Sequence, residues 1–411
     1  MSMTTRNALA KIAEAYVNLV LAVGEHDPSY VDAYYGSPEQ QQKVKDNVPS
    51  LDSILAKSRE LIETLGNISV PAEEERRKKY LQKQLQALEA HTRQLQGERF
   101  SFDEEARLLY DAIPPKFSEE HFISLLHELD NLFPGTITIS ERVESYRKNF
   151  IIPTDKLEKV FHIALEECRA RTQKFIPLPS YEQFHLEFVR EKSWSGYNWY
   201  KGNGESIIQI NIDLPIFAER IVDLAAHEGY PGHHVYNILL EQECLRQRRW
   251  IEFSIYALYS PQSFIAEGAA NYGIDVAFPD NERMIYERDV LFPICGFDPL
   301  EAERYSELQR ISTQLNYAHN EAARNYLDGL WTTTQTQEWL VTYALMSPER
   351  ALQRIHFFEQ YRSYVINYNF GLDLVKRYCQ NQIGDEKNFS KRWEVFRTLF
   401  SIPFVPSELV M

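Results

Sequence analysis

SIIQINIDLPIFAERIVDLAAHEGYPGHH, residues 206–234, places a strand pattern, a helix pattern and three histidines in direct succession. Its first part alternates apolar and polar side chains and is rich in isoleucine, which predicts a strand over 206–214. PIFAERIVDLAAHE, residues 215–228, has apolar side chains at helical spacing. This spacing predicts a helix that Pro215 opens and that ends on the His-Glu pair. The sequence therefore predicts a strand followed directly by a helix that carries the histidine motif at its end.

HEGYPGHH, residues 227–234, differs from the HExxH zinc motif in the spacing of its histidines. In HExxH the two histidines are four residues apart on one helical face and bind one metal ion. The fourth residue after His227 is Pro231, which cannot bind a metal ion. On an unbroken helix, His234 would lie roughly 10 Å along the axis from His227, and His233 would lie on another face. A regular helix therefore excludes a shared ion.

Pro231 and Gly232 predict an interruption that removes this difficulty. Proline clashes with a continuing helix, and glycine adopts backbone conformations that other residues resist. A two-residue bulge after Glu228 would bring His233 to the place of the second histidine of HExxH. A glutamate beside the first ligand acts as general base in such sites. The segment therefore predicts these residues: His227 and His233 as metal ligands, His234 as the alternative ligand, and Glu228 as the general base.

The third ligand is expected on a later helix, because catalytic zinc takes three protein ligands and keeps one position open. QSFIAEGAANYGIDVAF, residues 262–278, is an apolar helical segment that contains Glu267. A carboxylate there is costly unless it is paired or bound to a metal ion. Small neighbours allow another helix to approach, and Asn271, one turn later, can orient a histidine ligand. We predict Glu267 as the third ligand; the alternative is a buried glutamate that caps another helix. Two nitrogens and one oxygen favour one Zn²⁺ per chain.

The rest of the chain has mainly helical periodicity. We expect a mainly α fold with a small β-sheet beside the motif helix and a central cleft. The aromatic stretch Trp194–Tyr200 is expected as a buried hairpin cluster or, alternatively, as the mouth of the cleft. Residues 1–411 are expected to form one catalytic unit with three parts: helical 1–180, the sheet and metal-motif helices in 181–300, and helical 301–411 closing the cleft. Helices are predicted over 6–23, 74–96, 102–112, 117–132, 139–149 and 154–173.

Composition narrows the class of partner and the compartment. The chain has 411 residues and a net charge of −15, so nucleic acid and anionic membranes are poor partners. The four cysteines are widely spaced and form no CxxC pair, which favours buried thiols in a reducing compartment. The apolar run near the N-terminus is interrupted by Glu14 and Asn18 and reads as an amphipathic helix, not a signal peptide. A cytoplasmic location is therefore expected; the oligomeric state stays open.

HEGYPGHH and AEGAANYG together resemble the motifs of the bacterial family named domain of unknown function 885 (DUF885), which is similar to gluzincin metallopeptidases. The family pattern is roughly HExxPGHH followed by EGWxxY, and this chain has Ala269 at the tryptophan position. The specific motifs lie in 227–272, and the wider resemblance spans about 75–385. It implies a metallopeptidase fold in which the third zinc ligand is a glutamate on a downstream helix and substrate lies along an edge strand.

The resemblance implies hydrolysis of short peptides or small amides, with an oxyanion donor from the C-terminal part of the chain. Near that end this sequence keeps Tyr368 and Gly371 but has Arg362–Val365 in place of a PGQA element. Tyrosines there recur at helical spacing, and the alternative for each is a place in an aromatic core. Two other functions stay open: a zinc hydrolase of a non-peptide amide or ester, and a catalytically inactive helical binding protein. The candidate oxyanion residues are Tyr364, Tyr368, His319 and Arg362.

Overall fold

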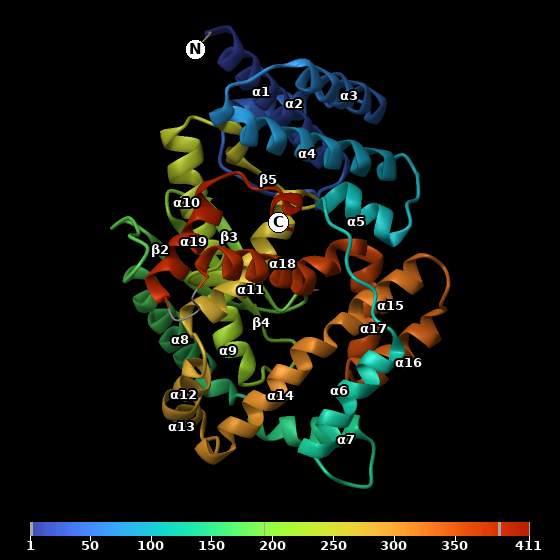
Figure 1. The fold of residues 1–411 in the computed structure, drawn as a ribbon, viewed down its shortest axis with the longest axis vertical. Coiled ribbons are helices and arrows are strands. Elements are labelled where there is room, and N and C mark those ends of the chain that lie inside the picture. Colours follow the sequence, from blue (N-terminus) through green and yellow to red (C-terminus); the bar gives the residue numbers. More distant parts are fainter. Residues whose placement is uncertain (1–2, 193, 385–387, 411) are drawn as a thin grey trace.

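The structure, a computed structural model, describes residues 3–192, 194–384 and 388–410 and is mainly helical (Figure 1). Most predicted helices are present with ends within a few residues of the prediction. Those before the sheet are α1 (Met3–His26), α2 (Pro38–Asp46), α3 (Leu51–Asn67), α4 (Ala72–Leu95), α5 (Phe102–Tyr110), α6 (Glu119–Leu132), α7 (Ile139–Arg147) and α8 (Leu157–Gln173). Those after it are α9 (Glu219–Leu224), α10 (His233–Leu239), α11 (Pro261–Ala277), α12 (Glu282–Tyr286), α13 (Phe292–Cys295), α14 (Ala302–Leu315), α15 (Tyr317–Leu327), α16 (Thr333–Tyr343), α17 (Pro348–Tyr361), α18 (Ile366–Ile383) and α19 (Phe389–Ser401).

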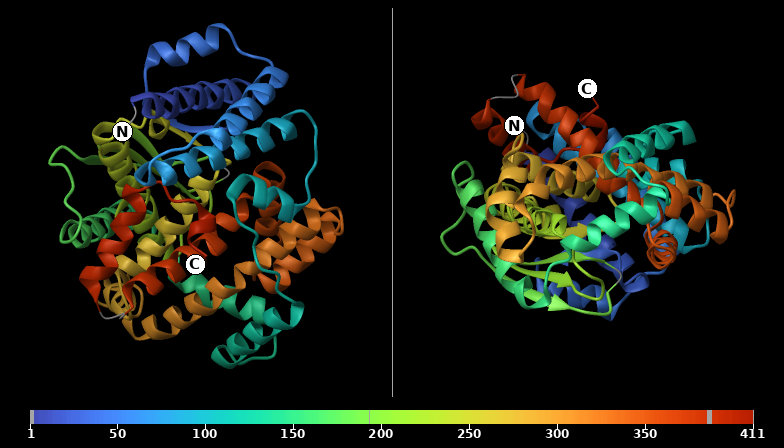
Figure 2. Two further views of the ribbon diagram at one scale, coloured as in Figure 1. Left: turned by 45° about the horizontal axis from the view of Figure 1, so that its top comes forward. Right: turned by 90° about the horizontal axis from the view of Figure 1, so that it is seen from below.

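Three strands form the small sheet that the sequence predicts beside the motif helix. They are β2 (Gln183–Val189), β3 (Gly196–Gly202) and β4 (Glu205–Asn211), and β4 lies in the centre. β2 runs parallel to β4, whereas β3 and β4 form an antiparallel hairpin. Figure 2 shows this sheet on one side of the helical body. A second, two-stranded sheet pairs β1 (Val31–Tyr34) with β5 (Ile255–Ala257).

The predicted start of the motif helix at Pro215 is wrong. Phe217 forms an isolated antiparallel bridge with Ile151. Beside it, Ile152 N–H donates to the Ile216 carbonyl, and Ala218 N–H donates to the Phe150 carbonyl, both at 2.9 Å. These long-range backbone bonds outweigh the local preference of proline for a first helical turn. The helix therefore begins only at Glu219.

The centre of the molecule is the crossing of α11 and α18 (Figure 1). Gly268 of α11 faces Gly371 of α18, and a Cβ atom on Gly268 would lie 2.4 Å from the Gly371 carbonyl oxygen. The close approach expected from the small residues around Glu267 is thus present. One continuous apolar core surrounds this crossing and includes side chains from Leu9 to Leu409. α11 consequently carries Glu267 in the middle of the fold.

Candidate metal centre

The motif helix is interrupted where the sequence predicts it. α9 passes into a π-helical turn, Ala225–Gly229, that contains His227 and Glu228. Tyr230 has an extended backbone, and a new helix, α10, begins at His233. Gly232 closes the break: its N–H donates to the Ala226 carbonyl at 2.9 Å. A Cβ atom at residue 232 would lie 1.9 Å from the His227 carbonyl oxygen, so only glycine fits there.

This path brings His227 and His233 together with Glu267. The two Nε2 atoms are 3.1 Å apart. Glu267 Oε2 lies 3.2 Å from His227 Nε2, and Glu267 Oε1 lies 3.6 Å from His233 Nε2. The three side chains are 10–14% exposed, so the group is enclosed but reachable by water. Three residues from two distant segments therefore converge on one point.

The geometry of this triad fits a metal ion. Ligand atoms on a tetrahedral zinc ion with bonds of about 2.0–2.1 Å lie roughly 3.3–3.4 Å apart. Glu267 Oε2 is buried and accepts no hydrogen bond from any described residue, although His227 Nε2 lies 3.2 Å away. A buried carboxylate oxygen without a donor is costly unless a cation faces it. His227, His233 and Glu267 could hold one such ion, with Oε2 as the carboxylate ligand atom.

Neighbouring side chains orient the triad. His227 Nδ1 lies 2.9 Å from Asn271 Oδ1, and Asn271 Nδ2 donates to the Tyr368 carbonyl at 2.8 Å. The amide orientation is fixed by that carbonyl, so His227 Nδ1 must donate and its Nε2 carries a lone pair. Tyr364 donates to Glu267 Oε1 at 2.8 Å, which leaves Oε2 free. Asn271 and Tyr364 thus hold two residues of the triad, His227 and Glu267, by hydrogen bonds.

Electrostatics around the triad favour positive charge. Burial alone would lower the pKa of His233, but the carboxylates of Glu267, Glu228 and Asp32 outweigh it and raise that pKa to about 9. Burial raises the pKa of the Asp32 carboxyl to about 7; His233 opposes the shift, and Glu267 and Glu228 add to it. Asp32 lies on β1 and was not identified from the sequence, where VDAYYG gives only the weak signal of one acid among apolar residues. The site therefore has a surplus of carboxylates.

Glu228 lies between the triad and the sheet. Its side chain abuts β3, because a Cβ atom on Gly196 would lie 3.0 Å from Glu228 Oε1. Asn198 of β3 donates to the Glu228 carbonyl at 2.6 Å and fixes the backbone there. Burial raises the pKa of the Glu228 carboxyl; the charges of His227 and His233 act against that shift. No described residue donates a hydrogen bond to this carboxylate, which leaves it open to water or substrate.

His234, the alternative ligand, is not part of the triad. It is fully buried, with Nδ1 2.7 Å from Ser206 Oγ and Nε2 3.1 Å from Glu182 Oε2. Tyr230 also donates to Glu182 Oε2, at 2.7 Å. Burial lowers the pKa of His234, although Glu182 opposes the shift. His234 therefore connects α10 with β4 through Ser206, and its ring nitrogens are not part of the candidate metal site.

The four candidate oxyanion residues have different surroundings, although the rings of Tyr364 and Tyr368 are in contact. Arg362 is paired with Glu105 of α5 at 2.5 Å, so the structure does not bring it to the triad. His319 Nε2 is buried without a hydrogen-bond partner among the described residues. Tyr364 is engaged by Glu267, as described above. Tyr368 is 37% exposed, although burial is the main cause that raises its pKa. Because more than a third of its surface is exposed, Tyr368 is the candidate that substrate can reach.

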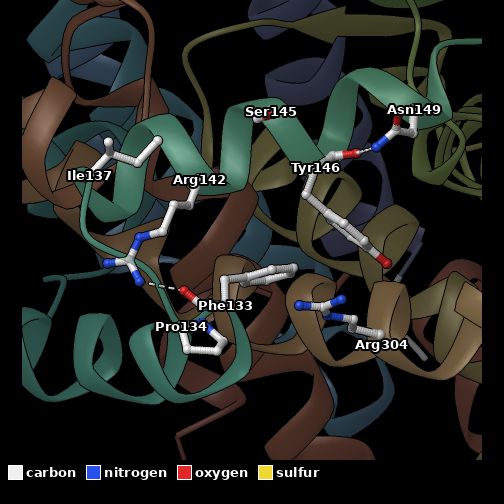
Figure 3. Close-up of a pocket in the computed structure, with 8 residues that line it drawn as sticks. All are labelled: Phe133, Pro134, Ile137, Arg142, Ser145, Tyr146, Asn149 and Arg304. Carbon is white, nitrogen blue, oxygen red and sulfur yellow. Dashed lines mark hydrogen bonds between the residues drawn. The ribbon is translucent and has the colours of Figure 1, made fainter.

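A surface pocket elsewhere gives a contrast to this site (Figure 3). It lies between the α6–α7 segment and α14, and shares no residue with the triad. Arg142 donates to the Phe133 carbonyl and pairs with Asp130 at 2.5 Å. Arg304 donates to the Leu132 carbonyl at 2.9 Å and stacks on the ring of Phe133. Because both cations are already satisfied by protein groups, this pocket offers little for a ligand.

Comparisons with known proteins show the fold only. No known family model and no curated protein matches the chain. A solved structure of a "putative lipoprotein" from Colwellia psychrerythraea has a TM-score of 0.56 and 17% identity, covering 90% of this chain and 68% of that chain. The BsuCP crystal structure (TM-score 0.48, 12% identity) covers 96% of this chain and 90% of its own. The structure of a "putative lipoprotein of unknown function" from Shewanella oneidensis (TM-score 0.45, 13% identity) covers 88% of this chain and 75% of its own.

The cysteines and the helices bear on the expected compartment. All four cysteines are buried and free, as the sequence predicts. No described helix is long and apolar enough to cross a membrane. The cytoplasmic location stays a prediction.

Proposed function

We propose that the chain is a zinc-dependent peptidase that hydrolyses short peptides, of the kind its resemblance to DUF885 and the gluzincins implies. One observation carries the proposal: the Nε2 atoms of His227 and His233 lie 3.1 Å apart, and the Glu267 carboxylate approaches them to 3.2 and 3.6 Å. Glu228 is next in the chain to the first of these residues. Two nitrogens and one carboxylate oxygen around an open position form the donor set of catalytic zinc sites. The similarity to the Colwellia structure concerns the overall fold alone and gives no information about activity.

The chain's own residues divide the remaining work. Bound zinc would supply a positive charge that lowers the pKa of water and polarises the substrate carbonyl. Glu228 would remove the proton of the attacking water and deliver it to the leaving amine. Tyr368, the accessible tyrosine, would donate to the carbonyl oxygen as negative charge develops there. Asn271 and Tyr364 would hold His227 and Glu267 in place through the hydrogen bonds described above.

The sheet supports binding of an extended substrate. β3 is an edge strand of the three-stranded sheet and packs directly against Glu228 through Gly196. An edge strand beside a catalytic carboxylate suits a peptide that adds to the sheet by backbone hydrogen bonds. The partial exposure of the triad and of Tyr368 supports the central cleft expected from the sequence. A cleft of this kind favours oligopeptides over folded proteins as substrates.

Metal analysis together with a peptide library tests the proposal. We expect about one zinc per purified chain, hydrolysis of short peptides, loss of activity on chelation and recovery when zinc is supplied. Zinc without peptide cleavage, but with cleavage of non-peptide amides or esters, would replace the peptidase by a related hydrolase. A chain that takes up no zinc even when zinc is supplied would leave only the inactive binding protein.

The choice between the two adjacent histidines gives a separate prediction. We expect His233→Ala to lose zinc, because it removes one of three ligands, and His234→Ala to keep zinc. His234→Ala should instead lower the free energy of unfolding by roughly 1–3 kcal/mol, because buried Glu182 and Ser206 each lose a partner. Zinc per chain after dialysis and urea unfolding curves measure the two effects. Full zinc in His233→Ala with loss in His234→Ala would show that the wrong histidine is assigned.

A further inference from the structure

Three arginines gather where α17 approaches the segment leading into the motif helix. Arg350 and Arg354 are one turn apart on α17 and therefore share a face. The Arg350 guanidinium lies 5.6 Å from the ring centroid of Phe217, three residues before Arg220. Arg220 and Arg350 are both close enough to Arg354 for their charges to lower its pKa; burial is the main cause. Like charges are thus concentrated in a protein whose net charge is −15.

Among the described carboxylates, only Asp223 forms an ion pair with this group, and it does so through Arg220. Among the described residues, the guanidinium groups of Arg350 and Arg354 make no hydrogen bond or ion pair and only stack on Phe217 and Phe357. Arg220 reaches Asp223 only at 3.5 Å, and Asp223 is already paired with Arg283 at 2.9 Å. All three of the clustered arginines are partly buried. Partly buried cations are normally paired, so the absence of a partner for Arg350 and Arg354 among the described residues indicates a missing anion.

A second nearby carboxylate is also already occupied. Glu219, the residue before Arg220, pairs with Arg147 and accepts a hydrogen bond from Tyr305. Arg350 lies in the first turn of α17, where the helix dipole disfavours a cation and favours an anion. The positive charge of Arg350 is therefore unfavourable in these surroundings, and an anion from outside the chain would stabilise it.

The arginine group is adjacent to the candidate catalytic residues. The Arg354 guanidinium lies 5.0 Å from the centroid of the Phe357 ring, and that ring is 6.4 Å from the ring of Tyr368. Tyr368 contacts the ring of Tyr364 at 5.7 Å, and Tyr364 holds Glu267. A substrate that reaches Tyr368 from the triad therefore comes next to Arg354.

We infer that Arg220, Arg350 and Arg354 form a subsite that binds a carboxylate of the substrate next to the bond that is cleaved; this rests on the proposed peptidase function. Arginine matches a carboxylate with two parallel hydrogen bonds, and more than one arginine allows the anion to be held from two sides. A peptide offers this group at its C-terminus or on an acidic side chain. The subsite determines specificity, because neutral substrates leave the arginines unpaired.

Binding of succinate to metal-free protein tests the subsite without any catalysis. The probe is succinate, its uncharged diamide is the ligand control, and calorimetry is the measurement. We expect succinate to bind wild type and the diamide not to bind. Arg350→Met and Arg354→Met should each weaken succinate binding roughly 10–100-fold, the range for hydrogen bonds to charged groups. Arg310→Met should bind as wild type, because exposed Arg310 of α14 pairs with Glu128 of α6 and with Glu307 of its own helix.

A folding control accompanies the binding test. Removing an unpaired, partly buried charge should leave the Tm of the two variants unchanged or raised, so weak binding cannot come from unfolding. Equal succinate affinity in wild type, Arg350→Met and Arg354→Met would overturn the subsite. Since no metal is present, this outcome is independent of whether the chain is a zinc peptidase.

Peptide hydrolysis then distinguishes the two sources of carboxylate. We expect kcat/KM to fall roughly 10–100-fold in Arg354→Met for peptides with the carboxylate, and little for peptides without it. Loss on C-terminal amidation assigns the C-terminal carboxylate, whereas loss on exchange of Glu for Gln in the peptide assigns a side chain. Equal kcat/KM for all these peptides in wild type would overturn the inference while leaving the peptidase function intact.

Discussion

Glu228→Gln is expected to lower kcat for peptide hydrolysis by about 10²–10⁴-fold, the range for loss of a general base, while zinc per chain stays as in wild type. Glutamine keeps the shape of the side chain but cannot accept the proton of water. Glu228 is not one of the three ligand residues, and its carboxylate accepts no hydrogen bond from described residues, so the fold does not depend on its charge. Steady-state kinetics and metal analysis on the same preparation measure both quantities.

A second buried glutamate separates loss of the base from general loss of a buried carboxylate. Glu241 is buried and accepts hydrogen bonds from Tyr200 and from the Asn203 N–H, away from the triad. Glu241→Gln should therefore lower stability but leave kcat of the folded protein near the wild-type value. Glu228→Gln with wild-type kcat would remove Glu228 from the reaction. Loss of zinc in Glu228→Gln would instead show that its carboxylate supports the metal site.

The metal motif was predictable from the sequence because its signals are local. Pro231 cannot continue a helix, and Gly232 marks a close backbone approach, so the break after Glu228 follows from the order of residues alone. The structure has this break and brings His233, not His234, beside His227. Glu267 could also be found, because a carboxylate in an apolar helix needs an unusual partner.

The errors and omissions have long-range causes. The sequence suggests that Arg362 is available to an oxyanion, whereas in the structure it forms an ion pair with Glu105 of α5. The place of His234 depends on Glu182, which lies on another segment and is 3.1 Å from His234 Nε2. Arg350 and Arg354 occur at the spacing of an ordinary solvated helix face, and only the packing of α17 near Arg220 shows that they lack partners. Local patterns do not encode which charges a distant segment will neutralise.

Gly232→Ala is expected to lower the free energy of unfolding by at least about 3 kcal/mol and to abolish zinc binding. A Cβ atom at this residue would lie 1.9 Å from the His227 carbonyl oxygen and 2.4 Å from that of Ala226. Both are backbone atoms, so relief requires the π-helical turn to move. That movement breaks the Gly232–Ala226 hydrogen bond and separates His227 from His233, since the two ligands lie on either side of the break.

Gly66→Ala provides the matched control, because Gly66 lies in α3 and nothing is within 4 Å of the position of its Cβ atom. Alanine there should leave stability unchanged or raise it by up to about 1 kcal/mol through its better helix propensity. Urea unfolding and zinc per chain are measured for both variants beside wild type. If Gly232→Ala unfolds at the wild-type urea concentration and retains zinc, the motif does not need the close approach of backbone at Gly232. The two-residue bulge would then not be what brings His233 to the metal site.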